Sequence, residues 1–403
     1  MNIESKRLLR LPPYMLGTLR QKTHQMRRSG IDVIDLGMGN PDQRTPQHVI
    51  DKLCETAQEA RNHRYAPSKG IFNLRREICR LYASRYNVML DPETEAVSVI
   101  GTKEGIANLA LAIVDEGDIA LIPDPTYPIH MYSVVIAGGS VISVPLNDVE
   151  TFIPSVAQIV ESIRPKPKMM ILSFPHNPTG AVVDLAFFEE AVQFALRHEI
   201  LLVHDMAYAD LTFDGVEAPS VLQVPKAKEI AVEFYSLSKS HSMAGWRTGF
   251  CVGNRDIIAA LAKIKSYSDY GIFLPIQVAA IMALRTEEHI LKETAATYRK
   301  RRDVLIDSFA RSGWEIPTPP ATIFAWAPIP EPYRAEGSLK FATRLLNEAE
   351  VCVSPGVGFG TQGDGHVRIA LVENENRIRQ AARQIRRALQ LPNKQNGNGK
   401  AQQ

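Results

Sequence analysis

IAVEFYSLSKSHSMAGWRTG (230–249) joins an apolar run typical of a buried strand to a polar turn that places anion-binding groups around one amine. Ser236 and Ser238 precede Lys239, and Arg247 follows it by eight residues. Hydroxyls and a guanidinium bind phosphate oxygens, while burial and cationic neighbours lower the pKa of an amine until it can attack a carbonyl. The segment therefore predicts a lysine that holds a phosphorylated aldehyde. A lysine in a plain polar loop is the alternative, and the other motifs decide between the two.

Similar apolar runs recur along the chain. Between about residues 46 and 285 they alternate with longer helical patterns, which indicates an α/β fold with a mostly parallel central sheet flanked by helices. Several runs are apolar throughout, as expected for strands that are covered on both faces. The predicted strands are AVSVI (96–100), IALIPD (119–124), SVISVP (140–145), MMILSFP (169–175), ILLVHD (200–205), IAVEFYS (230–236) and GFCVGN (249–254).

The character of the sequence changes after about residue 285. A long charged helix (286–312) precedes a proline-rich stretch and two strand candidates, ATIFAWAPI (321–329) and HVRIALV (366–372). This pattern predicts a smaller α+β domain formed by both chain ends. The expected parts are 1–45 as an N-terminal arm and part of the small domain, 46–285 as the large domain, 286–391 as the small domain, and 392–403 as a disordered tail.

Charge and composition narrow the range of partners. The net charge of +2 from 46 basic and 44 acidic residues gives no reason to expect nucleic-acid binding. The basic runs YRKRR (298–302) and RIRQAARQIRR (377–387) have helical spacing and are interpreted as solvated helix faces. No segment has the roughly 20 apolar residues of a membrane span.

The four cysteines are far apart and form no Cys-x-x-Cys pair, which favours a reduced, cytoplasmic protein without a disulfide framework. No metal is expected either. His204 and His241 lie next to candidate site residues, but nothing near them has the spacing of metal ligands, so both are interpreted as packing groups.

Polar residues follow several of the predicted strands, at the ends where ligands collect in open α/β sheets. In IGTKEG (100–105) the N–H groups of Thr102 and Lys103 open a helix and can face an anion, although such turns are often only turn geometry. In PDPTYP (123–128) the ring of Tyr127 can either stack on a flat cofactor or pack in the core.

Two further motifs are more specific. SFPHNPTG (173–180) fixes the amide of Asn177 in a rigid turn, where it can donate to a phenolate oxygen. VHDMAY (203–208) ends a strand with Asp205 and places Tyr208 three residues later. A carboxylate at the end of an apolar strand needs a partner, and a protonated ring nitrogen would serve as one.

Together these motifs resemble the fold type I aminotransferases of class I/II. The likeness runs from LGMGNPD (36–42) to HVRIALV (366–372) and rests on Asn-Pro-Thr-Gly, the Asp-x-x-Tyr strand end, Ser-x-Ser-Lys and the arginine that follows. Within the class, the bacterial glutamate–pyruvate (alanine) aminotransferases are the most similar subgroup. The stretches that resemble this subgroup are KPKMMIL, VHDMAYAD, LSKSHSMAGWR, KSYSDYG and VCVSPGVGFG.

The resemblance implies pyridoxal 5'-phosphate (PLP) as cofactor. Lys239 would bond to its aldehyde carbon and later carry a proton between the substrate Cα and the cofactor. The residues implied for the phosphate are Thr102, Lys103, Ser236, Ser238 and Arg247. Those implied for the ring are Asp205 at the nitrogen, Asn177 and Tyr208 at the 3'-oxygen, and Tyr127 on the face.

The resemblance also implies how substrate and a second subunit are bound. Arg368 matches the arginine that grips the α-carboxylate, with the backbone of Gly39 and the amide of Asn177 nearby. Tyr65, in RYAPSKG, matches a tyrosine that reaches the phosphate of the neighbouring subunit, so a homodimer with shared sites is expected.

The expected reaction is a ping-pong transfer between an L-amino acid and a 2-oxo acid, with alanine and 2-oxoglutarate as the expected pair. In aspartate-specialised relatives a partner's arginine binds the distal carboxylate, whereas KSYSDYGIFLP (265–275) contains no arginine and carries Asp269, which would repel that group. LL-diaminopimelate or aspartate aminotransferase, and a PLP-dependent C–S lyase, remain as alternatives. A PLP-sensing transcriptional regulator does not fit, because too few residues precede the first strand-like segment to form a DNA-binding domain.

Overall fold

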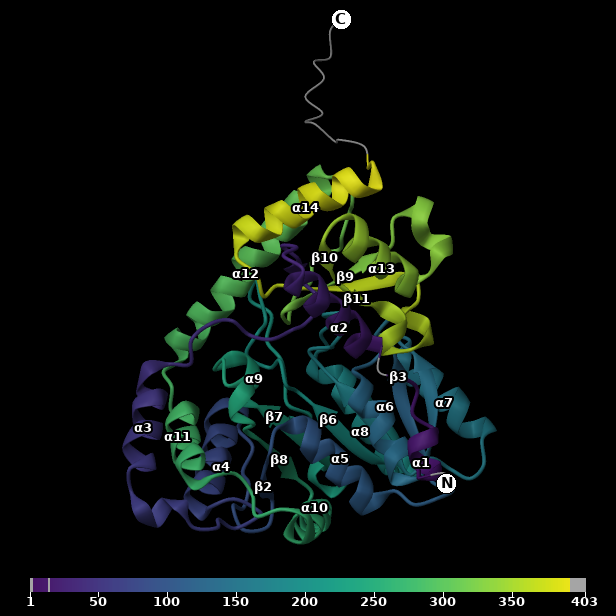
Figure 1. The fold of residues 1–403 in the computed structure, drawn as a ribbon. Helices are drawn as coiled ribbons and strands as arrows, with labels where there is room; N and C mark the ends of the chain where they lie inside the picture. The colour runs from purple at the N-terminus through teal and green to yellow at the C-terminus, as the bar shows by residue number, and fades with distance from the viewer. Residues whose placement is uncertain (1–2, 14, 392–403) are drawn as a thin grey trace, which may run out of the picture.

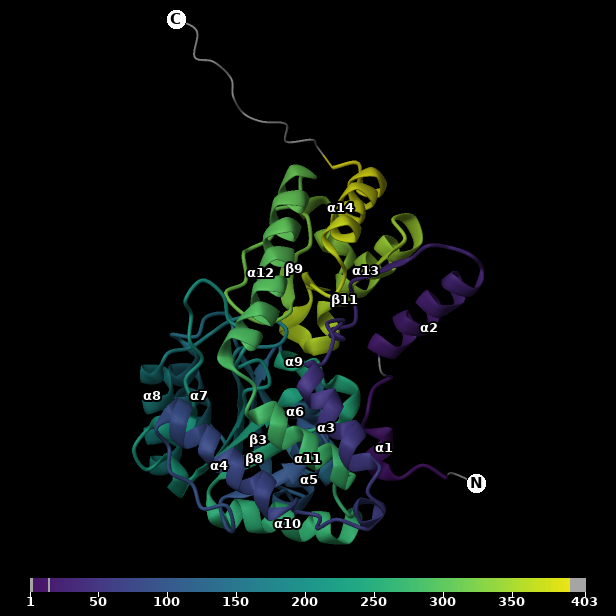
Figure 2. The same cartoon turned by 90° about the vertical axis from the view of Figure 1, so that its left-hand side faces the viewer.

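The computed structural model describes residues 3–13 and 15–391, and the predicted disordered tail 392–403 lies outside the described residues. Figure 1 shows two layered parts, one above the other, with the N-terminal helices α1 (Lys6–Leu9) and α2 (Met15–Arg28) running alongside both. The view turned by 90° in Figure 2 places α2 at one side of the molecule. None of the helices in the described part of the chain is long and apolar enough to cross a bilayer.

The lower part is built on a seven-stranded sheet, which confirms the predicted fold class. All seven predicted strands are present, in the order β2-β8-β7-β6-β5-β3-β4, and every neighbouring pair is parallel except those that involve β8. The strands are β2 (Ala96–Val99), β3 (Ile119–Asp124), β4 (Ser140–Pro145), β5 (Met169–Ser173), β6 (Leu201–Asp205), β7 (Ala231–Ser236) and β8 (Gly249–Gly253).

Helices cover both faces of this sheet, which explains the unbroken apolar strands. Along β5, Met169 and Ile171 join one core cluster while Met170 and Leu172 join the other, because successive strand side chains point to opposite faces. One face carries α5 (Thr102–Ile113), α6 (Pro128–Ala137) and α10 (Arg255–Ser268). The other carries α4 (Phe72–Tyr86), α7 (Phe152–Ser162), α8 (Leu185–His198) and α11 (Leu274–Leu284), with α3 (Gln47–Ala57) against α11.

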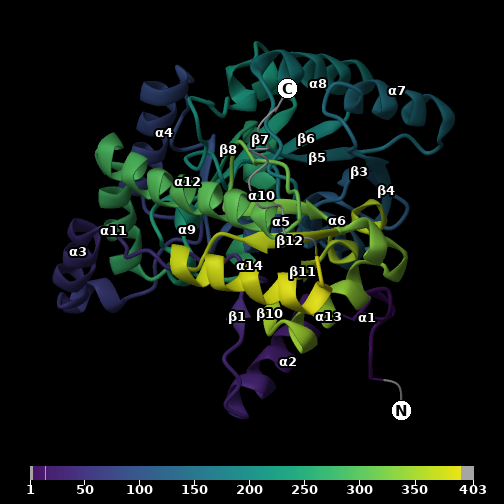
Figure 3. The same ribbon diagram turned by 90° about the horizontal axis from the view of Figure 1, so that it is seen from above.

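The upper part has a hydrophobic cluster of its own. An antiparallel sheet of β11 (Ser354–Pro355), β12 (His366–Ala370) and β9 (Phe324–Pro328) packs with α12 (Glu288–Arg311), α13 (Ser338–Glu348) and α14 (Glu375–Leu389). A two-stranded parallel pair, β1 (Ile34–Asp35) and β10 (Val351–Cys352), links the beginning of the chain to this part. Seen from above, α12 and α14 lie side by side over the strands (Figure 3).

One interpretation of the sequence was wrong. The run Tyr298–Arg302 was expected on a solvated helix face, yet Tyr298, Arg301 and Arg302 are buried. Arg301 forms a two-pronged ion pair with Asp42 at 2.7 Å, and Arg302 pairs with Asp214 at 2.6 Å. The guanidinium groups tolerate burial because carboxylates from distant loops neutralise them.

The parallel register determines where the polar strand ends meet. Ser173 at the end of β5 lies beside Asp205 at the end of β6, and Asp205 lies beside Phe234 of β7, two residues before Ser236. Because parallel strands finish at the same edge of a sheet, the motifs that follow them are gathered on one side of the molecule.

Candidate active site

A cavity of about 850 Å³ opens at this edge, between the seven-stranded sheet and the upper part. Its lining includes residues from the strand ends, from the segment after β1, and from β9 and β12. Every predicted site residue except Tyr65 lines it: Gly39, Thr102, Lys103, Tyr127, Asn177, Asp205, Tyr208, Ser236, Ser238, Lys239, Arg247 and Arg368.

Lys239 lies in the short helix α9 (Leu237–Ser240), directly after β7. Its Nζ donates a hydrogen bond to the carbonyl of Gly39 at 2.8 Å. Burial, followed by the charges of Arg368 and Arg247, lowers the pKa of this amine to about 8. A sizeable neutral fraction is therefore present near neutral pH, as a nucleophile requires.

The residues that were predicted to bind the phosphate surround the start of α5. The helix begins at Thr102, directly after Gly101, whose φ of +78° and close contact with Arg247 leave no room for a Cβ. Arg247 donates to Ala244 O at 2.8 Å and, at a long 3.5 Å, to Ile100 O. The guanidinium therefore lies over the N-terminus of a helix, an arrangement that suits an anion.

Two serines complete this end of the cavity. The hydroxyl of Ser236 caps α9 by accepting a hydrogen bond from Ser238 N at 3.1 Å, and both side chains are largely buried. Ser236 at the end of β7 and Ser238 in α9 both line the cavity together with Lys239.

The hydrogen bonding of Asp205 tests whether the cavity fits the expected cofactor. Oδ2 accepts a hydrogen bond from Nε2 of His130 at 3.0 Å, and Nδ1 of His130 in turn accepts one from Thr126 Oγ1 at 2.8 Å. Oδ1 is buried and has no hydrogen-bond partner among the described residues. A buried carboxylate oxygen left in this state calls for a donor, and a protonated pyridine nitrogen in the cavity provides one.

Arg368 lies between two aromatic rings. Its guanidinium carbon is 3.8 Å from the ring centroid of Phe324 and 4.5 Å from that of Phe359. Nη1 donates to Asn177 Oδ1 at 2.8 Å, and Nη2 donates to Gly37 O at 3.1 Å. The carbonyl beside Arg368 thus belongs to Gly37, while that of Gly39 faces Lys239.

The two tyrosines that were expected at the cofactor ring also lie here. The ring centroid of Tyr208 is 5.9 Å from Lys239 Nζ, and burial holds the pKa of its hydroxyl well above the ordinary range. Tyr127 borders the cavity, with its ring edge-on to that of His130.

Tyr65 stands apart from this cavity. It is 84% exposed and packs against Tyr270, with the ring centroids 4.4 Å apart. Asp269, which was expected to repel a substrate carboxylate, is not among the lining residues, because its side chain turns inward to Lys265. The segment was expected to act on the site of the partner subunit, so its place outside the cavity of its own chain leaves that expectation as a prediction.

Several lining residues were not predicted from the sequence. His130, which holds Asp205 from outside the cavity lining, was also not predicted, and its place on the first turn of a helix, three residues after Tyr127, is the one local sign of its position. Arg20, Gln21 and His24 reach the cavity from α2, which carries no motif. In the described part of the chain, no group of three or more His, Cys, Asp or Glu side chains is arranged to hold a metal ion.

Comparison with known proteins decides the family. The model of the family "Aminotransferase class I and II" matches residues 31–385. The chain belongs to the class I and II aminotransferases. It is an α/β enzyme of that class, its cofactor is PLP, and the residues around Asp205, Lys239 and the start of α5 fit that group.

Individual relatives of this aminotransferase carry different names. It is 53% identical to the glutamate-pyruvate aminotransferase AlaC of Escherichia coli over 380 residues, which covers 94% of this chain and 92% of that one. The LL-diaminopimelate aminotransferase of Moorella thermoacetica is 43% identical over 386 residues, 96% of this chain and 98% of its own. The substrate-bound BacF structure from Bacillus subtilis superposes with a TM-score of 0.91 at 35% identity, and the match covers 98% of this chain and all of BacF.

Proposed function

We propose that this aminotransferase transfers the amino group of L-alanine to 2-oxoglutarate, and back, in a ping-pong reaction. The observation that carries the proposal is the 53% identity to a glutamate-pyruvate aminotransferase over almost the whole chain. The segment 265–275 supports it, because it contains no arginine to bind the distal carboxylate of a short dicarboxylic donor. Pairing of Asp269 with Lys265 leaves this reasoning intact, since Lys265 is then occupied.

The residues of the cavity divide the work between binding and proton transfer. Arg368 binds the substrate α-carboxylate, and its contacts with the rings of Phe324 and Phe359 help to hold the guanidinium in place. The amine of Lys239, with its lowered pKa, would take the proton from Cα and pass it to the cofactor in the first half-reaction, and would carry a proton in the opposite direction in the second. When bound, the conjugated ring of PLP takes up the negative charge that develops at Cα.

The remaining residues hold the cofactor. Asp205, fixed by His130, would keep a proton on the ring nitrogen, and Asn177 and Tyr208, which line the cavity, would hold the 3'-oxygen. Tyr127 covers the ring face. The phosphate is assigned to Thr102, Lys103, Ser236, Ser238 and Arg247.

A homodimer with shared sites is part of the same proposal. Tyr65 does not reach the cavity of its own chain, and it forms a patch of exposed aromatic side chains with Tyr270. Such a patch suits contact with a second copy, which would bring Tyr65 to the phosphate of the partner.

LL-diaminopimelate is the second candidate donor. Relatives at 43% identity carry that name, and a cavity of about 850 Å³ is larger than alanine needs. Initial rates with alanine, aspartate, glutamate and LL-diaminopimelate, each against pyruvate or 2-oxoglutarate, test the proposal. Alanine is expected to exceed aspartate about tenfold or more in kcat/KM, about 1.4 kcal/mol. A preference for aspartate or LL-diaminopimelate would overturn the alanine assignment.

A further inference from the structure

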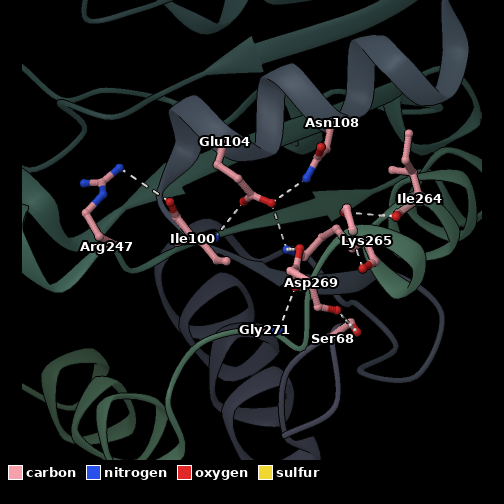
Figure 4. Close-up of polar contacts among 10 residues, drawn as sticks. Ser68, Ile100, Glu104, Asn108, Arg247, Ile264, Lys265, Asp269 and Gly271 are labelled. Atoms are coloured by element: carbon pink, nitrogen blue, oxygen red, sulfur yellow. Dashed lines mark hydrogen bonds and ion pairs between the residues drawn. The ribbon is translucent and has the colours of Figure 1, made fainter. Parts of the chain in front are cut away.

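Lys265 is a charged side chain with no exposure to solvent, and it lies outside the cavity. Its Nζ donates to Glu104 Oε1 and to Asp269 Oδ2, each at 2.9 Å (Figure 4). The lysine comes from α10, whereas Glu104 belongs to the first turn of α5, more than 150 residues earlier. Burying an ammonium group is costly, so its place between two carboxylates needs a reason.

Glu104 is the link between this lysine and the active site. Its Oε2 accepts a hydrogen bond from Ile100 N at 2.7 Å, and its Oε1 accepts one from Asn108 Nδ2 at 2.5 Å. The carbonyl of Ile100 also accepts the long hydrogen bond, at 3.5 Å, from Arg247. Glu104 therefore closes the turn at Ile100 (Figure 4), two residues before Thr102, which lines the cavity.

The hydrogen bond from Ile100 N to Glu104 places a negative charge where it is unfavourable. A carboxylate in the first turn of α5 lies close to the place assigned to a doubly charged phosphate, and like charges in a partly buried setting repel each other. Lys265 offsets that charge from the side away from the cavity. It does so without competing for the anion, because its own hydrogen bonds go to Glu104 and Asp269.

The other end of the ion pair is also fixed. Asp269 Oδ1 accepts a hydrogen bond from Gly271 N at 2.6 Å, and Asp269 O accepts one from Ser68 Oγ at 2.7 Å. Gly271 has a φ of +74°, and a Cβ there would press on Pro67. The ammonium is therefore anchored to two rigid turns, so that its position relative to Glu104 is set by the backbone.

We propose that Lys265 is a positioning residue for the cofactor phosphate: it neutralises and orients Glu104, so that the turn before α5 binds the dianion. The inference rests on the proposed assignment of the phosphate to Thr102, Lys103 and Arg247. If the buried ion pair only stabilised the fold, its loss would weaken the binding of every ligand of the cavity alike.

Pyridoxal, which lacks the phosphate, distinguishes a role of Lys265 in phosphate binding from a role in stability alone. The apoenzyme of the full chain is titrated with PLP and with pyridoxal, and binding is followed by cofactor absorbance. Lys265→Met is expected to raise the Kd for PLP about tenfold or more, and that for pyridoxal less than about twofold. Inorganic phosphate, used as a competitor of PLP, should lose affinity in parallel.

The charge on Glu104 supplies a second variant that does not depend on the folding of the first. Glu104→Gln keeps an oxygen that can accept from Ile100 N but removes the negative charge, so PLP should bind as tightly as in the parent or more tightly. In Glu104→Gln/Lys265→Met, PLP affinity should recover most of what Lys265→Met loses. Weaker PLP binding in Glu104→Gln with unchanged pyridoxal binding would contradict the inference.

Lys228→Met is the matched control. Lys228 pairs with the largely buried Glu95 at 3.0 Å, and neither residue lines the cavity. Its loss should lower the melting temperature without changing the ratio of PLP to pyridoxal affinity. If Lys265→Met behaves like this control while Arg247→Ala abolishes the preference for PLP, the inference about Lys265 is overturned. If Arg247→Ala also leaves the preference unchanged, the phosphate assignment itself is wrong.

Discussion

His130 donates a hydrogen bond from Nε2 to Oδ2 of Asp205 at 3.0 Å, and this contact leaves Oδ1 as the oxygen available to a bound ligand. Thr126 holds the other ring nitrogen of His130, so the tautomer that donates to Asp205 is favoured. The orientation of the carboxylate is thereby fixed before the cofactor enters. Preorganised charge of this kind acts mainly on the rate of the chemical step.

Asp205→Ala is accordingly expected to cost more in turnover than in cofactor affinity. Without the carboxylate the ring nitrogen loses its proton, and turnover should fall about 100-fold or more, about 3 kcal/mol of barrier. The check is kcat from steady-state kinetics beside the Kd for PLP. His130→Phe should give a smaller loss, because Asp205 keeps its charge but not its fixed orientation. Near-native turnover in Asp205→Ala would mean that the carboxylate is only structural.

The lowered pKa of Lys239 gives a pH dependence. The neutral amine captures an aldehyde, and a pKa of about 8 means that its population is half-maximal near pH 8 and levels off about one to two pH units higher. The rate of pyridoxal capture by apoenzyme, measured by stopped-flow absorbance, should follow this curve. A midpoint near the ordinary lysine pKa, about 10.4, would contradict it.

Arg247→Leu tests the cause of that shift. Removing a nearby positive charge makes the ammonium form easier to hold, so the pKa of Lys239 should rise and the capture profile should move to higher pH. Pyridoxal is used because it carries no phosphate for Arg247 to bind. Arg344→Leu, which removes an arginine paired with Glu336 and Glu348, should leave the midpoint unchanged.

The strands and the residues at their ends could be predicted because each depends on local sequence. A short apolar run such as 200–205, which ends in a polar turn, is typical of a strand that is covered on both faces, and β6 spans Leu201–Asp205. The strand order depends on pairings between distant segments, which no local pattern contains. The place of Asp205 in the site could thus be predicted, but its neighbours in the sheet could not.

The residues that were missed or misread depend on distant partners. Helical spacing places Arg301 on one face of α12, but only the folded chain shows that Asp42 covers that face. Likewise, the carboxylate of Asp269 was interpreted as unpaired, and only the folded chain shows its ion pair with Lys265. His130 is a single histidine on a helix, and its role follows only from its contact with Asp205.

Shared active sites predict complementation between inactive chains. Lys239 and Arg368 line one cavity of one chain, whereas Tyr65 lies outside it. Mixing Lys239→Ala with Tyr65→Ala chains should restore about a quarter of the parental sites, since half of randomly formed dimers are mixed and each has one complete site. Mixing Lys239→Ala with Arg368→Ala should restore none. Recovery in neither mixture, or sedimentation as an active monomer, would contradict shared sites.

Among the lysines and arginines of the described cavity lining, Arg20 is the one that is not assigned to the phosphate, the aldehyde or the α-carboxylate. Of the other lysines and arginines among the described lining residues, Lys103 and Arg247 are assigned to phosphate, Lys239 to the aldehyde and Arg368 to the α-carboxylate. Arg20 is exposed on α2 and forms no hydrogen bond or ion pair with the other described residues. A free guanidinium at the cavity wall suits the distal carboxylate of glutamate and 2-oxoglutarate.

Arg20→Gln should therefore separate the two substrate pairs. We expect KM for glutamate and 2-oxoglutarate to rise about tenfold or more, about 1.4 kcal/mol, because an ion pair to the distal carboxylate is lost, while KM for alanine and pyruvate changes less than about twofold. Arg28→Gln, on the same helix but outside the cavity lining, is the control and should change neither pair. Equal losses for both pairs would show that Arg20 supports the cavity wall rather than the substrate. No loss for either pair would mean that another cation binds the distal carboxylate, and the selectivity of the site for glutamate would then have to come from that group.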